Sequence, residues 1–144
     1  MSMTQPTEPG SLYLQMLRNV LFLSPHEAAS LFPNMTVDQW NDIESGRAPA
    51  SEVVVDKFKS IFEYRNKQLV MYRQVIESNP TARFDAFWFR TMDDWMAIEE
   101  HEPEGYRVTQ SLNASLATEY PSRFKLYPFD PETRSANPVT SGPG

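Results

Sequence analysis

The sequence has no cysteine, so disulfide bonds and thiolate metal sites are excluded. Its two histidines, His26 and His101, lack a second ligand residue at a spacing typical of a metal site. We therefore expect both to be surface residues with no metal bound. No apolar run approaches membrane-spanning length, and the polar, proline-bearing segment 1–10 does not resemble a signal peptide. A cytoplasmic protein with no membrane partner is expected.

Patterns for catalysis and cofactor binding are also missing. There is no Ser/His/Asp arrangement with supporting glycines and no glycine loop that could cradle a phosphate. The acidic stretch Glu99–Glu104 is more typical of a solvated turn than of a carboxylate pair for acid/base catalysis. We expect no catalytic residues, no cofactor and no small-molecule ligand.

The chain also lacks an excess of basic residues. The chain has 13 Lys and Arg against 19 Asp and Glu, which gives a net charge of −6. This balance counts against a simple nucleic-acid binder, which usually has a basic surface. It does not exclude one, because a small positive face can lie on an acidic protein.

The first part of the chain contains two segments whose residues are typical of a helix start. Ser24-Pro25-His26-Glu27 has the form of a capping box with proline at the first helical position, and Thr36-Val37-Asp38-Gln39 is a second box. Gly46 follows the second helix, where a left-handed residue ends a helix favourably. Two short helices separated by residues 32–35 predict a helix-turn-helix unit, whose second helix commonly enters the DNA major groove.

Apolar spacing predicts four helices over residues 11–22, 25–31, 37–44 and about 51–78. In the third, Val37, Trp40 and Ile43 face inward. The long fourth helix has a seven-residue apolar repeat broken by Arg65. The residues of this predicted seam are Val55, Phe62, Leu69 and Ile76, with Phe58 and Tyr72 between them.

After Asn79-Pro80 the sequence changes character. It predicts short strands over about 84–90 and 123–127, a helix start at Thr91 and a helix over 108–120. The predicted fold is mainly α: a repressor-like helix-turn-helix bundle with a long fourth helix and a small α+β C-terminal dimerisation region. The expected parts are a disordered lead-in (1–10), a DNA-binding domain (11–78), a dimerisation region (79–127) and a disordered tail (128–144).

The outward face of the third helix is the candidate DNA-reading surface. With the apolar residues inward, the side chains facing out are Asp38, Gln39, Asn41 and Asp42. Glutamine and asparagine amides can pair with adenine, and a carboxylate can accept from cytosine. Residues placed to contact phosphates are Arg18, Thr36, Arg47, Lys57 and Lys59. The alternative interpretation is an ordinary solvated helix face.

Aromatic residues are dense in the first predicted strand. Phe84, Phe87, Trp88 and Phe89 place bulky groups on both of its faces, so that one face can cover the core and the other a partner. We prefer a homodimer interface to a ligand pocket at this cluster.

The combined pattern resembles the YdiL-like helix-turn-helix family, which is related to anti-CRISPR-associated transcriptional repressors. In the first half the resemblance rests on Leu14-Gln15-x-Leu17-Arg18, Glu27-Ala28-Ala29 and Trp40-x-x-Ile43-Glu44-Ser45-Gly46-Arg47. In the second half it rests on Tyr106-Arg107-x-x-Gln110-Ser111-Leu112-x-Ala114. It covers about residues 12–120. The chain departs from the family pattern at Ile43, where a second tryptophan is usual, and at Ser51, where proline is usual.

The resemblance implies a DNA-binding N-terminal domain and a C-terminal dimerisation region, with Gln110 and Ser111 in the latter. Relatives of the anti-CRISPR-associated type are autorepressors on inverted repeats. We therefore predict a homodimeric regulator whose partners are double-stranded DNA and a second copy. One alternative is an antitoxin-like or adaptor module that has kept the fold and lost DNA binding, which the acidic third helix favours. The other is an enzyme or ligand binder that uses the aromatic C-terminal half.

Overall fold

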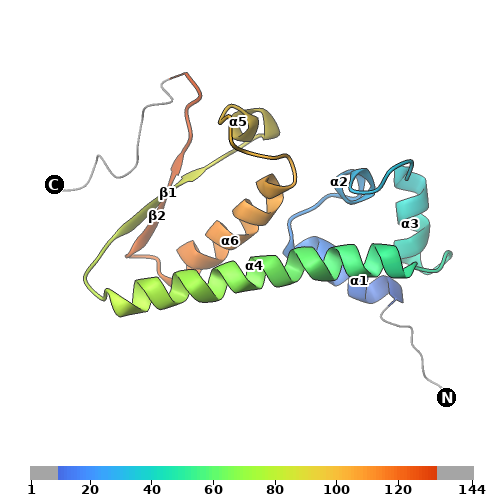
Figure 1. Cartoon of the computed structure of the whole chain (residues 1–144), viewed down its shortest axis with the longest axis horizontal. Coiled ribbons are helices and arrows are strands. Elements are labelled where there is room, and N and C mark those ends of the chain that lie inside the picture. The colour runs from blue at the N-terminus through green and yellow to red at the C-terminus, as the bar shows by residue number, and fades with distance from the viewer. Residues whose placement is uncertain (1–9, 133–144) are drawn as a thin grey trace, which may run out of the picture. The chain divides into compact units, whose positions relative to one another are not determined.

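The computed structural model describes residues 10–132, so the predicted lead-in and most of the predicted tail lie outside the described residues. The helices are α1 (Gly10–Val20), α2 (Pro25–Ser30), α3 (Val37–Ser45), α4 (Glu52–Ser78), α5 (Met92–Met96) and α6 (Gly105–Glu119), and the strands are β1 (Phe84–Trp88) and β2 (Phe124–Pro128). Figure 1 shows the helices predominating and α4 running unbroken. The mainly helical prediction is confirmed.

The chain divides into two compact units, and the division falls inside α4 between Tyr64 and Arg65. The sequence interpretation instead places all of this helix with the first domain. Unit 1 therefore comprises α1, α2, α3 and the first half of α4. Unit 2 comprises the second half of α4 and everything after it.

The core of unit 1 lies between its four helical segments. Its fully buried side chains include Leu14 and Leu17 of α1, Trp40 of α3 and Phe58 of α4. The Trp40 and Phe58 rings stack with centroids 5.1 Å apart. Aromatic stacking adds to the stabilisation from burial, so these two rings join α3 to α4.

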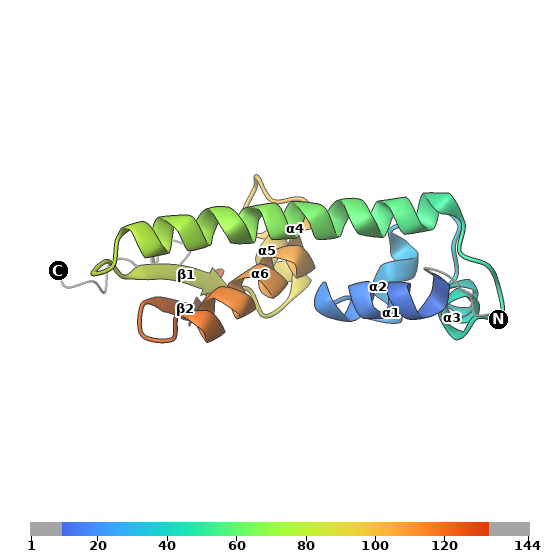
Figure 2. The same ribbon diagram turned by 90° about the horizontal axis from the view of Figure 1, so that it is seen from below.

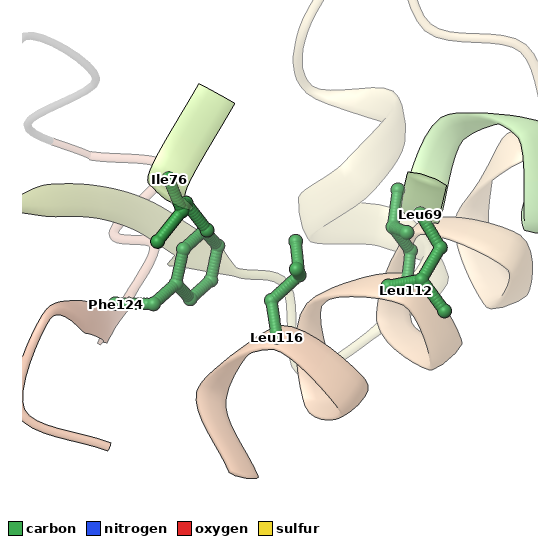
Figure 3. Close-up of a cluster of buried hydrophobic side chains, with 5 residues drawn as sticks. All are labelled: Leu69, Ile76, Leu112, Leu116 and Phe124. Atoms are coloured by element: carbon green, nitrogen blue, oxygen red, sulfur yellow. The ribbon is translucent and has the colours of Figure 1, made fainter. Parts of the chain in front are cut away.

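Unit 2 contains a two-stranded parallel sheet packed on helices. β1 pairs with β2 in a register that places Phe84 beside Phe124 and Trp88 beside Pro128. Figure 2 shows α6 next to the second half of α4. The buried cluster that joins these elements consists of Leu69, Ile76, Leu112, Leu116 and Phe124, and Figure 3 shows their side chains meeting between the helices and the strand.

Unit 2 contains a second buried cluster, which is made of aromatic side chains. It is formed by Phe89, Trp95, Tyr106 and Phe129. His101 stacks on Trp95 with ring centroids 3.5 Å apart and is half-buried, so it lies at the surface only in part. The reason is that its flat ring covers the tryptophan face, a contact that the acidic neighbouring sequence does not suggest.

Gly105 begins α6 directly against this cluster. A Cβ atom at that position would lie 2.8 Å from the Trp95 ring, closer than van der Waals contact allows. The Trp95 Nε1 donates to the Glu102 carbonyl at 2.7 Å, which holds the ring in this place. Glycine is therefore required by the close approach of the helix start to the indole.

The predicted apolar seam of α4 is only partly correct. Leu69 and Ile76 are buried in unit 2, but Tyr72 is exposed. Arg65, which interrupts the repeat in the sequence, is itself buried. The physical reason is that serine side chains on α6 satisfy its guanidinium, so the charged group lies inside the unit.

Order continues beyond the predicted end of the folded region. Pro128 belongs to β2, and Phe129 is buried against Phe87 and Phe89. Residues 128 and 129 therefore belong to the folded region and not to the predicted tail, and residues 133–144 lie outside the described residues. Among residues 10–132, no helix has both the length and the apolar character needed to cross a membrane.

Candidate nucleic-acid interface

Both predicted capping boxes are present, one at the start of α2 and one at the start of α3. We call the segment made of α2, the turn and α3 the elbow. The Glu27 N–H donates to Ser24 Oγ at 3.1 Å, and the Ser24 N–H donates to Glu27 Oε1 at 2.8 Å. The Gln39 N–H donates to Thr36 Oγ1 at 3.1 Å, and the Thr36 N–H donates to Gln39 Oε1 at 2.8 Å. Each pair satisfies backbone donors that a helix start otherwise leaves unpaired, so α2 and α3 begin at fixed residues.

The turn and the helix exit use residues suited to left-handed backbone. Asn34 in the turn has φ of 63°, which asparagine tolerates better than most residues. Gly46 has φ of 85°, and its N–H donates to the Ile43 carbonyl at 3.1 Å. The predicted glycine stop of α3 is confirmed, and the elbow has defined geometry at both ends of α3.

Glu44 fastens the inner side of α3. It accepts from Trp40 Nε1 at 2.9 Å and from Arg18 Nη2 at 3.1 Å, and it also accepts from Arg18 Nε. Arg18 Nη1 donates to the Leu23 carbonyl at 2.8 Å, and the arginine side chain is only 12% exposed. Arg18, predicted as a phosphate contact, is therefore engaged inside the unit and joins α1 to α3.

The outward face of α3 lies where the helical spacing places it. Asp38, Gln39 and Asn41 are exposed, Asp42 is half-buried, and Trp40 is fully buried on the opposite side. Within residues 10–132 the Asn41 amide makes no hydrogen bond, so both its donor and its acceptor face solvent. Asn41 is thus available for the paired contact that an adenine edge offers.

Gln39 differs from Asn41 because one half of its amide is already used. Its Oε1 accepts the capping hydrogen bond from the Thr36 backbone, which leaves Nε2 as an outward donor. A donor alone suits an acceptor such as guanine N7 or O6 or thymine O4, rather than the donor–acceptor pair of adenine. Gln39 therefore combines a capping role with one possible base contact.

The carboxylates of α3 are largely balanced within the unit. Asp42 Oδ1 accepts from Arg47 Nη2 at 2.9 Å and from Nε at 3.0 Å, with the Asp42 side chain 47% and the Arg47 side chain 68% exposed. Glu44 is paired with Arg18. Asp38 lies in the first turn of α3, where a negative charge interacts favourably with the helix dipole. The acidic character of α3 is thus weaker than its sequence indicates.

The remaining phosphate candidates lie on the surface of unit 1. Thr36, Arg47, Lys57 and Lys59 are all exposed. Lys57 and Lys59 are two residues apart on α4, so they point to opposite sides of the helix and do not both face one DNA strand. Arg47 adjoins the end of α3 and is the basic residue closest in sequence to the candidate reading face.

The aromatic residues predicted at a dimer interface pack largely within unit 2. Phe84 packs against the buried cluster that contains Leu69, Ile76, Leu112, Leu116 and Phe124. Phe87 lies edge-on to Phe129 at 5.3 Å, and Phe89 is buried. Trp88 is only partly buried at the end of β1. Phe84, Phe87 and Phe89 therefore pack into the two buried clusters of unit 2, and Trp88 belongs to neither cluster.

Gln110 and Ser111 are also internal. Gln110 Nε2 donates to the Phe89 carbonyl at 3.0 Å and to the Tyr106 hydroxyl at 3.2 Å. Ser111 is fully buried and accepts from Arg65 Nε at 2.7 Å. These bonds join α6 to α4 and to Phe89, the residue that follows β1, so the Gln110 and Ser111 side chains are not exposed to a partner.

Unit 1 is defined by its capped α2–turn–α3 elbow, which is the helix-turn-helix arrangement of regulatory DNA-binding domains. The chain belongs to the Aca2/YdiL-like family, whose model matches residues 10–123. This confirms the resemblance found in the sequence and indicates a regulatory helix-turn-helix protein rather than a member of an enzyme family. No curated protein matches the chain.

Proposed function

We propose that this chain is a homodimeric, sequence-specific DNA-binding transcriptional regulator that represses its own promoter at an inverted repeat. The observation that carries the proposal is the outward polar face of α3. Gln39 and Asn41 are exposed on a helix fixed by caps at both ends and anchored by the buried Trp40. A rigid helix with exposed amides is suited to reading base edges.

In the proposed mechanism α3 of each copy enters the major groove, and the two helices lie about 34 Å apart on successive turns of the duplex. Asn41 and Gln39 contact bases, with Asp38 and Asp42 placed beside them. Thr36 and Arg47 contact phosphates at the two ends of α3, and Lys57 or Lys59 adds a further phosphate contact. A dimer bound in this way at a promoter excludes RNA polymerase without any chemical step.

The test is a mobility-shift assay with the DNA upstream of the chain's own reading frame. We expect a shift that weakens steeply as salt rises, because phosphate contacts release counterions. The rival function is a protein-interaction module that has kept the fold and lost DNA binding, which the net charge of −6 favours. Absence of a salt-sensitive shift on any inverted repeat in that DNA supports the rival.

Gln39→Glu separates DNA reading from folding. Glutamate keeps the acceptor that caps α3 but removes the outward donor and adds a negative charge. We expect an unchanged melting temperature and a loss of operator affinity of about 5- to 150-fold, corresponding to the ~1–3 kcal/mol of one base contact. The matched control is Asn19→Ala on the exposed surface of α1, which should change neither quantity. Unchanged operator affinity in Gln39→Glu contradicts the assigned role.

A further inference from the structure

The two-stranded sheet of unit 2 has one edge whose backbone groups can be placed individually. The Phe84 N–H donates to the Arg123 carbonyl at 2.8 Å, and the Phe129 N–H donates to the Trp88 carbonyl at 3.0 Å. In a parallel ladder with this register, the even-numbered residues of β1 direct both backbone polar groups toward β2. The odd-numbered residues therefore direct theirs away from the sheet.

Asp85 and Phe87 are the odd-numbered residues within β1. Their two N–H groups and two carbonyls have no hydrogen-bond partner within residues 10–132. Every residue of β1 is partly exposed. A row of unpaired strand groups is a template for pairing with another strand.

The outer edge of β2 is protected by contrast. Pro128 has no N–H, and the Phe124 N–H already donates to the Tyr120 carbonyl at 2.8 Å. Lys125 adds an exposed charge to the same strand. Lysine and proline are residues by which proteins prevent strands from adding at an edge, whereas the β1 sequence Phe-Asp-Ala-Phe-Trp contains neither. The sheet is therefore open on the β1 side.

We propose that β1 pairs antiparallel with β1 of a second copy, which makes a continuous four-stranded sheet with the order β2–β1–β1–β2. This inference rests on the homodimer of the proposed function and locates its interface. Antiparallel pairing of identical strands follows from a two-fold axis, the commonest symmetry of protein dimers. It uses backbone groups at the edge, so it is compatible with aromatic side chains that already pack inside unit 2.

The register of this pairing follows from the residues. Asp85 opposite Asp85 brings two carboxylates together, which is destabilising. A register with Phe87 opposite Phe87 would place Asp85 opposite Phe89. This register is unfavourable because the Phe89 carbonyl already accepts from Gln110 Nε2 at 3.0 Å. The remaining register pairs Asp85 of each copy with Phe87 of the other copy. It places the two-fold axis at Ala86 and pairs both N–H groups and both carbonyls of each copy.

The same register gives compatible side-chain neighbours across the axis. Ala86 lies opposite Ala86 of the other copy, where a small side chain allows close approach of the strands. Phe84 lies opposite Trp88 of the other copy, and aromatic cross-strand pairs are favourable. This self-complementarity is the reason for assigning the edge to a second copy rather than to an unrelated peptide.

Asp85→Pro tests the interface directly. Proline removes the outward N–H of residue 85 but no bond to β2, and it is tolerated on an edge strand when its nitrogen faces outward. We expect the full-length variant to be monomeric at concentrations where the wild type is dimeric in sedimentation velocity. Asp85→Ala is the matched control, because it also removes the Asp85 contact with Arg83 (3.4 Å) but keeps the backbone donor, and it should remain dimeric.

A dimeric Asp85→Pro variant or a monomeric wild type overturns the interface. Operator binding is measured separately. A wild type that is dimeric and does not shift DNA defeats the proposed function while leaving this interface in place. A monomeric Asp85→Pro variant that still binds a single half-site supports both proposals.

A disulfide cross-link gives a second measurement that does not depend on proline. The chain has no native cysteine. In the proposed register residue 86 forms a non-hydrogen-bonded pair, whose Cα atoms lie about 4.5 Å apart, within the range of a disulfide. Ala86→Cys should form a covalent dimer under mild oxidation, whereas the control Lys125→Cys on the far strand should not. The absence of a dimer band with Ala86→Cys, or an equal yield from both variants, contradicts the register.

Discussion

Trp40→Ala is expected to lower the free energy of unfolding by about 3–5 kcal/mol, the usual loss when a buried tryptophan is truncated to alanine. Trp40 is fully buried, stacks on Phe58 and donates to Glu44, which also binds Arg18. The truncation leaves a cavity between α3 and α4 and removes one of the bonds that hold Glu44 in place. Since small domains are stable by only about 5–15 kcal/mol, this loss removes much of the stability.

Urea unfolding followed by circular dichroism measures this loss without relying on tryptophan fluorescence. Trp40→Phe is the matched control, because it keeps an aromatic ring against Phe58 and removes the Nε1 donor. We expect it to lose clearly less stability than alanine. If alanine and phenylalanine are equally destabilising, the hydrogen bond to Glu44 dominates and the packing explanation is incorrect. If neither destabilises, Trp40 does not anchor α3.

Arg65→Ala is expected to destabilise the protein by about 1.5–3 kcal/mol, the range for lost hydrogen bonds to a charged group. The guanidinium donates to Ser111 Oγ at 2.7 Å, to Ser115 Oγ at 2.6 Å and to Asn66 Oδ1 at 3.1 Å. Within residues 10–132 no carboxylate lies in ion-pair distance of it. Burial lowers the pKa of Arg65, nearby Arg73 lowers it further, and the negative charge of Glu119 raises it. Neutral hydroxyl and amide oxygens therefore make the direct contacts that stabilise this cation.

The control Arg65→Met separates the volume of the side chain from its charge. Methionine fills most of the space but makes none of the hydrogen bonds that the guanidinium donates to Ser111 and Ser115. Because both variants lose these bonds, we expect Arg65→Met to be nearly as destabilising as Arg65→Ala in urea unfolding. If methionine instead restores most of the stability, the volume of the side chain and not its hydrogen bonds holds α6 to α4.

The local structure of unit 1 was predictable because it is specified by neighbouring residues. Ser24 with Glu27, Thr36 with Gln39, and Gly46 act over one helical turn, and the structure has all three features where the sequence placed them. The outward position of Asn41 followed from the inward position of Trp40 by helical spacing alone. Short-range chemistry of this kind needs no knowledge of tertiary contacts.

Contacts between distant residues were not predictable. Arg18 and Glu44 are 26 residues apart, and nothing in their local sequence indicates that they bind each other. Arg65 and Ser111 are 46 residues apart, so the arginine reads as a break in an apolar repeat although it is satisfied by α6. The parallel pairing of β1 with β2 likewise depends on the path of the chain through α5 and α6. Charge alone favoured a phosphate contact for Arg18, and aromatic density favoured a partner-facing side for the first strand, whereas the fold packs Arg18 and most of the aromatic side chains inside the units.

The central claim, that α3 reads base edges, is tested most directly by combining Asn41→Ala with single base-pair changes in the operator. The wild type should lose about 5- to 150-fold affinity at the base pair that Asn41 contacts, the equivalent of ~1–3 kcal/mol. Asn41→Ala should bind the original and the changed base pair equally while keeping its discrimination at every other position. If Asn41→Ala keeps the full base preference of the wild type at all positions, α3 does not read DNA in the manner proposed.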